Sequence, residues 1–138
     1  MNRDEIMTIL PHRGNMLLVD EVNQVDGTAC GLYHVRGDEF FLDGHFPGNS
    51  VVPGVILCEI LAQSCCVLLA DVMKEGKLPL YAGLKEVKFR SPVKPGDDFI
   101  TKCRIIKARP PFYFAEGEGY VDDRLCVKAE FSFAVMGD

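Results

Sequence analysis

The carboxylate best placed for chemistry is Glu59, because it stands alone in an apolar segment. It is the only acidic residue between Val51 and Ala70, and Gln63 follows it one helical turn later on the same face. A carboxyl group that is buried without a cationic partner favours its neutral form. A neutral carboxylic acid at pH 7 can serve as a general acid, whereas a purely structural Glu59 would be satisfied by Gln63 or by the backbone.

A second candidate, His45, lies in the sequence Gly44-His45-Phe46-Pro47-Gly48. Histidine is the side chain most often used as a general base near neutral pH, and the flanking Gly and Pro residues predict a tight, rigid loop. His34 alternates with apolar residues of an expected strand, and His12 follows Pro11. We therefore select His45 as the candidate base and interpret the other two histidines as ordinary polar residues.

Pro53 and Gly54 mark the start of the helix that carries Glu59. The unpaired N–H groups of a first helical turn, together with the helix dipole, can stabilise a developing oxyanion. A base, a neutral acid and an oxyanion site suit removal of a proton next to a carbonyl and loss of a leaving group from the next carbon. The sequence has no phosphate-binding loop and no HExxH motif, so we predict neither a cofactor nor a metal.

These residues must be positioned by one long helix and about six strands. The segment from residue 36 to residue 54 is a long connection, which is usually functional in a compact domain. The long helix is apolar on nearly every side, so other structure must surround it. We predict an α+β fold in which an antiparallel sheet wraps around this central helix, with residues 1–138 as a single domain. The predicted helices are 4–10 and 55–74, and the predicted strands are 16–25, 30–35, 80–89, 99–108, 112–121 and 125–135.

Composition narrows the class of protein. The chain has 138 residues and a net charge of −5, which argues against general nucleic-acid binding. Its six cysteines form no CxxC pair, so we expect reduced, buried thiols. The start of the chain has no apolar signal segment. The stretch from Val51 to Ala70 has the length of a membrane span but contains a carboxylate, so we expect a cytoplasmic protein without a span.

Several blocks of sequence, spread over nearly the whole chain, resemble those of one family. The resemblance is to the (3R)-hydroxyacyl-[acyl-carrier-protein] dehydratases of bacterial type II fatty acid synthesis, the FabZ family. The blocks are Leu10-Pro11-His12-Arg13 with Met16–Asp20, Gly44–Gly48 with Pro53-Gly54-Val55, Glu59 with Ala62-Gln63, and Ala82–Asp97.

The resemblance implies a hotdog fold and an active site built by two chains, with His45 from one chain and Glu59 from the other. It implies a homodimer at minimum, with a hexamer (a trimer of dimers) as the larger alternative. In the implied reaction a 3-hydroxyacyl thioester on acyl carrier protein becomes the trans-2-enoyl thioester. His45 would remove the C2 proton, and Glu59 would protonate the departing hydroxyl group.

The resemblance also implies the residues that surround the substrate. Backbone N–H groups at the helix start would polarise the thioester carbonyl, and a polar side chain would orient the acid. The chain departs from the family at Gly14-Asn15-Met16, where a bulky aromatic segment is usual, so the preferred acyl chain length stays open. The predicted substrate-binding residues are Gly54, Val55, Phe46, Pro47 and Gln63.

Other functions fit the same residues. A hotdog acyl thioesterase would use a water molecule beside the acid, and a related dehydratase could also isomerise its enoyl product. The pathway could be fatty acid synthesis or a related lipid or polyketide-like route. A non-catalytic acyl-binding module has no evident need for a paired acid and base.

Charge is unevenly distributed along the chain. The stretch from Lys85 to Arg109 has eight basic and three acidic residues, and therefore a net charge of +5. This could be a solvated strand face. Alternatively, it could dock an acidic carrier protein by complementary charge. For that case the predicted docking residues are Arg90, Lys102 and Arg104.

Overall fold

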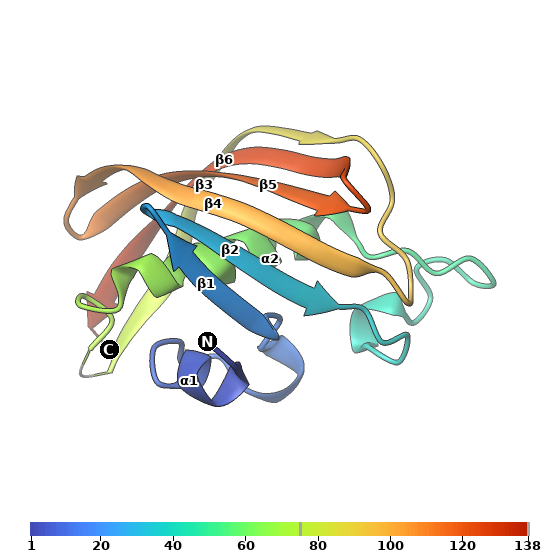
Figure 1. The fold of residues 1–138 in the computed structure, drawn as a ribbon, viewed down its shortest axis with the longest axis horizontal. Helices are drawn as coiled ribbons and strands as arrows, with labels where there is room; N and C mark the ends of the chain where they lie inside the picture. Colours follow the sequence, from blue (N-terminus) through green and yellow to red (C-terminus); the bar gives the residue numbers. More distant parts are fainter. Residues whose placement is uncertain (75, 138) are drawn as a thin grey trace.

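The computed structural model describes residues 1–74 and 76–137. Six strands form one sheet, in which neighbours follow the order β1-β2-β4-β5-β6-β3 and every pair is antiparallel. The helix α2 (Gly54–Cys66) lies along the concave side of this sheet (Figure 1). The strands are β1 (Glu21–Val25), β2 (Thr28–His34), β3 (Lys77–Phe89), β4 (Asp98–Arg109), β5 (Phe112–Val121) and β6 (Arg124–Gly137).

Two short turns fix the registers of consecutive strands. Asp26-Gly27 joins β1 to β2 with φ values of 50° and 79°, and Asp122-Asp123 joins β5 to β6 with values of 49° and 63°. Positive φ at both central residues matches the right-handed twist of paired strands. Asp tolerates this backbone better than most residues with a side chain. Each pair lies between two strands predicted from the sequence, where turn-forming residues are expected.

Side-chain alternation decides which face of the sheet meets the helix. Alternate residues from Leu125 to Val135 are apolar, which predicts one buried face. In β6, Val127, Ala129, Phe131, Phe133 and Val135 are buried, whereas Leu125 is only partly buried. In α2, nine of the thirteen residues are buried, because β2, β4, β5 and β6 all contact this helix. The predicted hotdog fold, with an antiparallel sheet wrapped around a central helix, is confirmed.

Three predicted elements are too long. The N-terminal helix α1 spans Arg3–Met7 rather than 4–10, and β1 begins at Glu21 rather than at residue 16. The backbone before β1 bonds instead to the side chain of Gln63, so it cannot pair as a strand. The long helix ends at Cys66, where the last turn tightens into a 3₁₀ helix over 67–69.

A missing side chain lets the sheet approach the helix. Gly31 in β2 faces Ser64 of α2 and Thr101 of β4, whose hydroxyl groups bond to each other at 2.9 Å. A Cβ atom at position 31 would lie 2.5 Å from the Thr101 hydroxyl oxygen and 2.6 Å from the Ser64 hydroxyl oxygen. Only glycine therefore fits here without displacing the helix.

The cysteines are all unpaired, as predicted. Cys58, Cys65, Cys66 and Cys103 are buried in the core. Burial raises the pKa of the Cys58 thiol to about 11 and raises the pKa values of the other three thiols as well. At neutral pH these groups are therefore uncharged thiols that pack as small apolar side chains.

Gly31→Ala should destabilise the fold by about 1–3 kcal/mol, because the added methyl group would separate Ser64 from Thr101 or shift α2. Urea unfolding measured by circular dichroism gives the change in the free energy of unfolding. Gly137→Ala is the matched control, since a Cβ atom there meets no atom within 4 Å. Equal midpoints for the two variants would contradict this account.

Candidate active site

The loop between η2 (Phe40–Leu42) and α2 fixes the orientation of His45. The His45 Nδ1 atom lies 3.0 Å from the carbonyl oxygen of Val51, and the Val51 N–H group bonds back to the His45 carbonyl oxygen at 2.9 Å. The imidazole ring also stacks on the ring of Phe46, with centroids 4.2 Å apart. A carbonyl can only accept a hydrogen bond, so Nδ1 carries the proton and Nε2 is left to accept one.

His45 shares a cleft of about 550 Å³ with the start of α2. Gly54 and Val55 line this cleft, and no side chain caps the helix beside them. Their N–H groups lie in the first helical turn, where a helix has no internal acceptors. The cleft therefore holds a candidate base next to two candidate donors for an oxyanion.

Phe89, at the end of β3, forms an apolar wall of this cleft. A Cβ atom on Gly54 would lie 2.8 Å from the Phe89 ring, so a larger residue at the helix start would collide with it. The Gly54 backbone is thus open to a ligand on one side and packed against an aromatic ring on the other.

Glu59 lies on α2 and makes two polar contacts through one oxygen atom. Its Oε2 atom accepts a hydrogen bond of 2.8 Å from Gln63 Nε2 and lies 3.4 Å from His12 Nε2. The Glu59 side chain is 22% exposed. The carboxyl group is therefore less buried than the sequence predicted, and the N-terminal segment places a histidine beside it.

Gln63 joins Glu59 to the N-terminal segment. Its Oε1 atom accepts a hydrogen bond from the Leu18 N–H group at 2.8 Å, and its Nε2 atom donates to the Met16 carbonyl oxygen at 2.7 Å as well as to Glu59. The side chain is 1% exposed. A buried amide with this many partners is fixed in orientation, so the carboxyl group of Glu59 is fixed with it.

The predicted site residues fall into separate groups within one chain. His45, Gly54 and Val55 line the same cleft, whereas Phe46 and Pro47 line a neighbouring hollow of about 490 Å³. Among the described residues, no hydrogen bond or ion pair joins His45 to Glu59.

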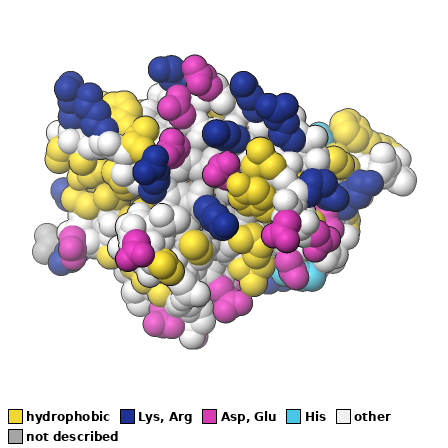
Figure 2. All heavy atoms as spheres, turned by 45° about the horizontal axis from the view of Figure 1, so that its top comes forward, with side chains coloured by type: hydrophobic (Ala, Val, Ile, Leu, Met, Phe, Trp, Pro, Cys, Tyr) yellow, Lys and Arg dark blue, Asp and Glu magenta, His cyan; other side chains and the backbone are white. Residues whose placement is uncertain are grey.

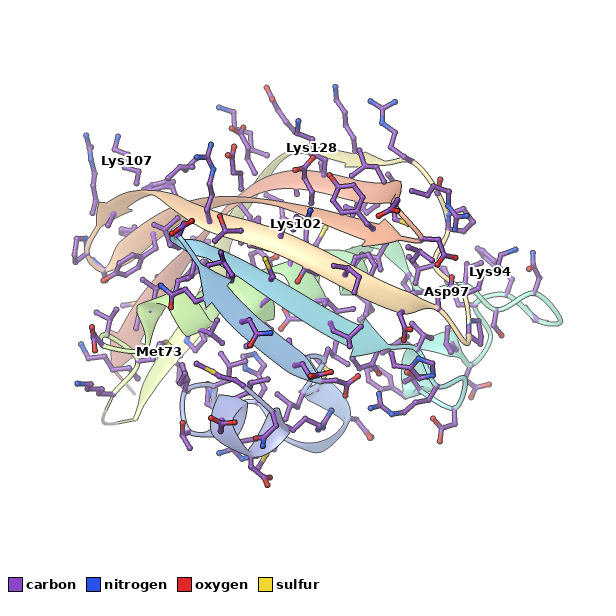
Figure 3. All side chains as sticks on the ribbon, viewed as in Figure 1. Met73, Lys94, Asp97, Lys102, Lys107 and Lys128 are labelled. Atoms are coloured by element: carbon purple, nitrogen blue, oxygen red, sulfur yellow. The ribbon has the colours of Figure 1, made fainter. Side chains whose placement is uncertain are left out.

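The predicted carrier-docking residues are also divided. Arg90 lines the His45 cleft. Lys102 and Arg104 lie on the outer face of β4, where Arg104 pairs with Glu116. Figure 3 shows Lys102 and Lys128 on this face, and in Figure 2 the basic side chains there are interspersed with acidic ones. Arg90 therefore lines a different hollow from Lys102 and Arg104.

Sequence reasoning missed two residues of the site. His12 was interpreted as an ordinary polar residue, although it belongs to the Leu10–Arg13 block that carries the family resemblance. Phe89 was interpreted only as the end of a strand. Neither residue has a spacing that points to His45 or Glu59, because the contacts come from segments far apart in the chain.

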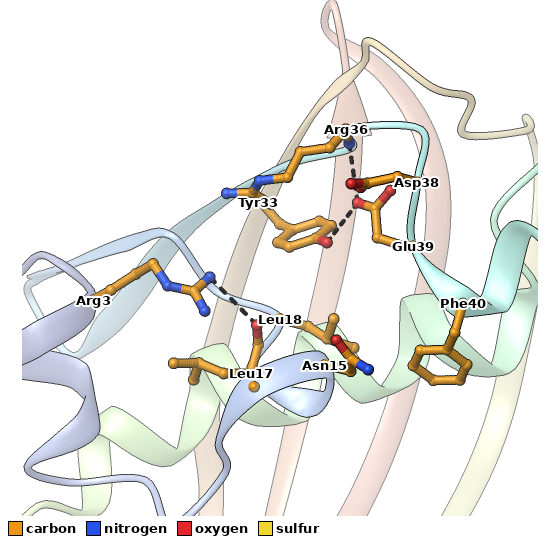
Figure 4. A pocket seen from close by; sticks show the side chains of 10 residues that line it. Arg3, Asn15, Leu17, Leu18, Tyr33, Arg36, Asp38, Glu39 and Phe40 are labelled. Atoms are coloured by element: carbon orange, nitrogen blue, oxygen red, sulfur yellow. Dashed lines mark hydrogen bonds between the residues drawn. The ribbon is translucent and has the colours of Figure 1, made fainter.

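A further hollow of about 330 Å³ lies beside α1 (Figure 4). Its charged groups bind one another: Arg3 and Arg36 both contact Asp20, and the hydroxyl group of Tyr33 donates to Glu39 at 2.6 Å. Burial is the main reason that the pKa of Tyr33 is raised, and the neighbouring Glu39 raises it further. These side chains hold the N-terminal segment against the sheet.

Known proteins resemble this chain over almost all of its length. The model of the FabA-like domain matches residues 10–130. The 3-hydroxyacyl-[acyl-carrier-protein] dehydratase FabZ of Fusobacterium nucleatum is 39% identical, covering 95% of this chain and 94% of that protein. The FabZ of Lactococcus lactis subsp. cremoris is 41% identical, covering 98% and 95%.

Solved structures agree on the fold. A structure of the dehydratase heterocomplex ApeI:P from Xenorhabdus doucetiae matches with a TM-score of 0.83 at 19% identity, covering 96% of this chain and 91% of that one. A Ralstonia eutropha protein assigned as a thioesterase matches with a TM-score of 0.64 at 20% identity, covering 83% of each chain. At these identities the structures support the fold alone, while the sequence relatives decide the family. The chain belongs to the FabA-like family and is a FabZ-like dehydratase.

Proposed function

We propose that this protein dehydrates (3R)-3-hydroxyacyl-[acyl-carrier-protein] to the trans-2-enoyl thioester in fatty acid biosynthesis, using His45 as the base and Glu59 as the acid. The observation that carries the proposal is the cleft in which the imidazole of His45 faces the uncapped start of α2. The named activity of the FabZ relatives supports the same reaction.

In the proposed mechanism the thioester carbonyl accepts hydrogen bonds from the N–H groups of Gly54 and Val55. These bonds stabilise the enolate oxygen that forms when His45 Nε2 takes the C2 proton. The electron pair of the broken C–H bond then forms the C2–C3 double bond. The hydrogen bond between His45 Nδ1–H and Val51 supports the imidazolium ion that results.

Glu59 completes the reaction by protonating the C3 hydroxyl group as the C3–O bond breaks, so that water leaves. The products are the enoyl thioester, water, an imidazolium ion at His45 and a carboxylate at Glu59. Transfer of one proton from His45 to Glu59 restores the starting state. Gln63 holds Glu59 Oε2 throughout, so the other carboxyl oxygen faces the reacting group.

His45→Ala and Glu59→Gln should each lower dehydration by about 100-fold or more, since each removes a proton-transfer group. The assay follows enoyl absorbance with a carrier-bound 3-hydroxyacyl substrate, together with a thiol reagent. His34→Gln is the matched control, because His34 pairs with Asp98 on the exposed end of β2. Full activity in either active-site variant would refute the mechanism, and release of free thiol would favour the thioesterase alternative.

We propose that a second copy of the chain completes each active site. The strand β3 is the edge of the sheet and is exposed along most of its length (Figure 1). Phe89 at its end and Val55 in the cleft are also exposed, Val55 to 71%. Pairing of β3 with its copy would cover this edge and bring Glu59 of one chain to His45 of the other.

Mixing the two inactive variants tests the shared site. If His45 and Glu59 act from different chains, unfolding and refolding His45→Ala with Glu59→Gln should restore about a quarter of wild-type activity. About half of the dimers would be mixed, and one of their two sites would contain both intact residues. If both residues act from one chain, the mixture stays inactive. Sedimentation of the same samples distinguishes a dimer from a hexamer.

We propose that the acidic carrier docks beside Arg90, because this exposed cation lines the cleft that holds His45. Lys102 and Arg104 are more distant cations and are surrounded by Glu116 and Glu118. Their contribution to docking should therefore be the smaller one. A substrate bound to a carrier protein and six unpaired thiols are consistent with a protein that acts in the cytoplasm.

Arg90→Glu should raise the KM for carrier-bound substrate roughly tenfold, while changing the KM for a short N-acetylcysteamine thioester by about twofold or less, because only the carrier presents a matching negative surface. Lys102→Glu is the comparison variant and should have a smaller effect. Equal losses on both substrates would contradict docking at Arg90.

A further inference from the structure

We infer that His12 is a positioning residue for Glu59: it holds the Oε2 atom of the acid and thereby directs the reactive proton to the Oε1 atom. This inference rests on the proposed role of Glu59 as the general acid. His12 belongs to the segment between α1 and η1 (Gly14–Met16), which no sequence argument connected with α2.

The two carboxyl oxygens of Glu59 have different surroundings. Glu59 Oε2 faces two nitrogen atoms, Gln63 Nε2 at 2.8 Å and His12 Nε2 at 3.4 Å. No hydrogen bond to Oε1 is found in the described part of the chain. The contact with His12 is longer than a usual hydrogen bond, so in this structure His12 lies beside Oε2 while Gln63 donates the hydrogen bond to it.

The tautomer of His12 depends on its other ring nitrogen. Its Nδ1 atom is buried and has no hydrogen-bond partner among residues 1–74 and 76–137. A buried N–H group without an acceptor is more costly than a lone pair without a donor, since nearly all buried donors in proteins are paired. The proton of the neutral ring therefore resides on Nε2, the nitrogen atom that lies 3.4 Å from Glu59 Oε2.

The segment that carries His12 is rigid. Arg13 donates hydrogen bonds to the carbonyl oxygens of Leu10 at 2.7 Å, His12 at 2.7 Å and Met7 at 3.0 Å. Gln63 binds the backbone at Met16 and Leu18 on the other side of the turn. The backbone of His12 is thus fixed from both sides, and its imidazole is held against Glu59.

The chemical consequence follows from these contacts. With both donors on Oε2, the acidic proton of neutral Glu59 is placed on Oε1, which is free to face the leaving hydroxyl group. A carboxylate accepts hydrogen bonds more strongly than a carboxylic acid. The two donors therefore stabilise the charge that appears as Glu59 releases its proton, which is a contribution made mainly in the transition state.

The other titratable groups near Glu59 cannot take this role. Burial raises the pKa values of Tyr81 of β3 and Cys66 of α2 well above neutrality, and the charge of Glu59 raises both further. Both remain uncharged, and the hydroxyl group of Tyr81 donates to the Cys58 carbonyl oxygen. Among the described titratable residues, His12 is therefore the one whose ring nitrogen lies against Glu59, next to the amide of Gln63.

Two substitutions separate positioning from packing. His12→Leu removes the donor, and His12→Gln places an amide N–H group near the position of Nε2. We expect His12→Leu to lower kcat about 10- to 100-fold with KM changed by about twofold or less, and His12→Gln to recover activity to within about threefold of wild type. His34→Gln is again the matched control, and thermal unfolding monitors the fold of each variant.

Each result decides the inference. An unchanged kcat in His12→Leu would overturn it, as would equal losses in His12→Leu and His12→Gln at unchanged unfolding temperature. If Glu59→Gln is inactive while His12→Leu is fully active, only the role of His12 fails. If Glu59→Gln is itself active, the proposed acid fails and the role of His12 fails with it.

Discussion

Within residues 1–74 and 76–137, the side-chain amide of Gln63 is the buried polar group that joins the central helix to the N-terminal segment. Its oxygen accepts from the backbone of Leu18, and its nitrogen donates to the backbone of Met16 and to Glu59. Because a buried amide without partners is costly, these bonds fix both the path of the chain before β1 and the orientation of the carboxyl group. The hydrogen bond from this side chain fixes one carboxyl oxygen of Glu59, beside which His12 also lies.

The helix that holds Gln63 also separates the site into two parts. Its uncapped start faces the cleft with His45, and Glu59 lies further along, against the N-terminal segment. The sheet keeps this helix in place through apolar packing and through glycines such as Gly31, where any side chain would strike Ser64. In the proposed dimer these two regions belong to two different active sites, because His45 of one chain would act with Glu59 of the other.

Much of this arrangement could be predicted from local patterns. The alternation in β6, the turns at Asp26-Gly27 and Asp122-Asp123, and the apolar helix together indicated a sheet wrapped around a helix. Glu59 and His45 were selected because their chemistry is unusual for their surroundings. The predicted ranges of β1 and α2 were too long. Apolar composition alone does not show where a strand or a helix ends and a segment bonded to a neighbouring side chain begins.

The sequence by itself determined the fold class, the family and the identity of the acid and base candidates, because these depend on side-chain types, short-range periodicity and motif order. Only the tertiary structure decided what surrounds them. It placed His12 beside Glu59 and Phe89 beside Gly54, and it assigned Arg90, rather than Lys102 or Arg104, to the His45 cleft. Such contacts join residues far apart in the chain, and they are set by how the sheet curves around the helix, which no local pattern encodes.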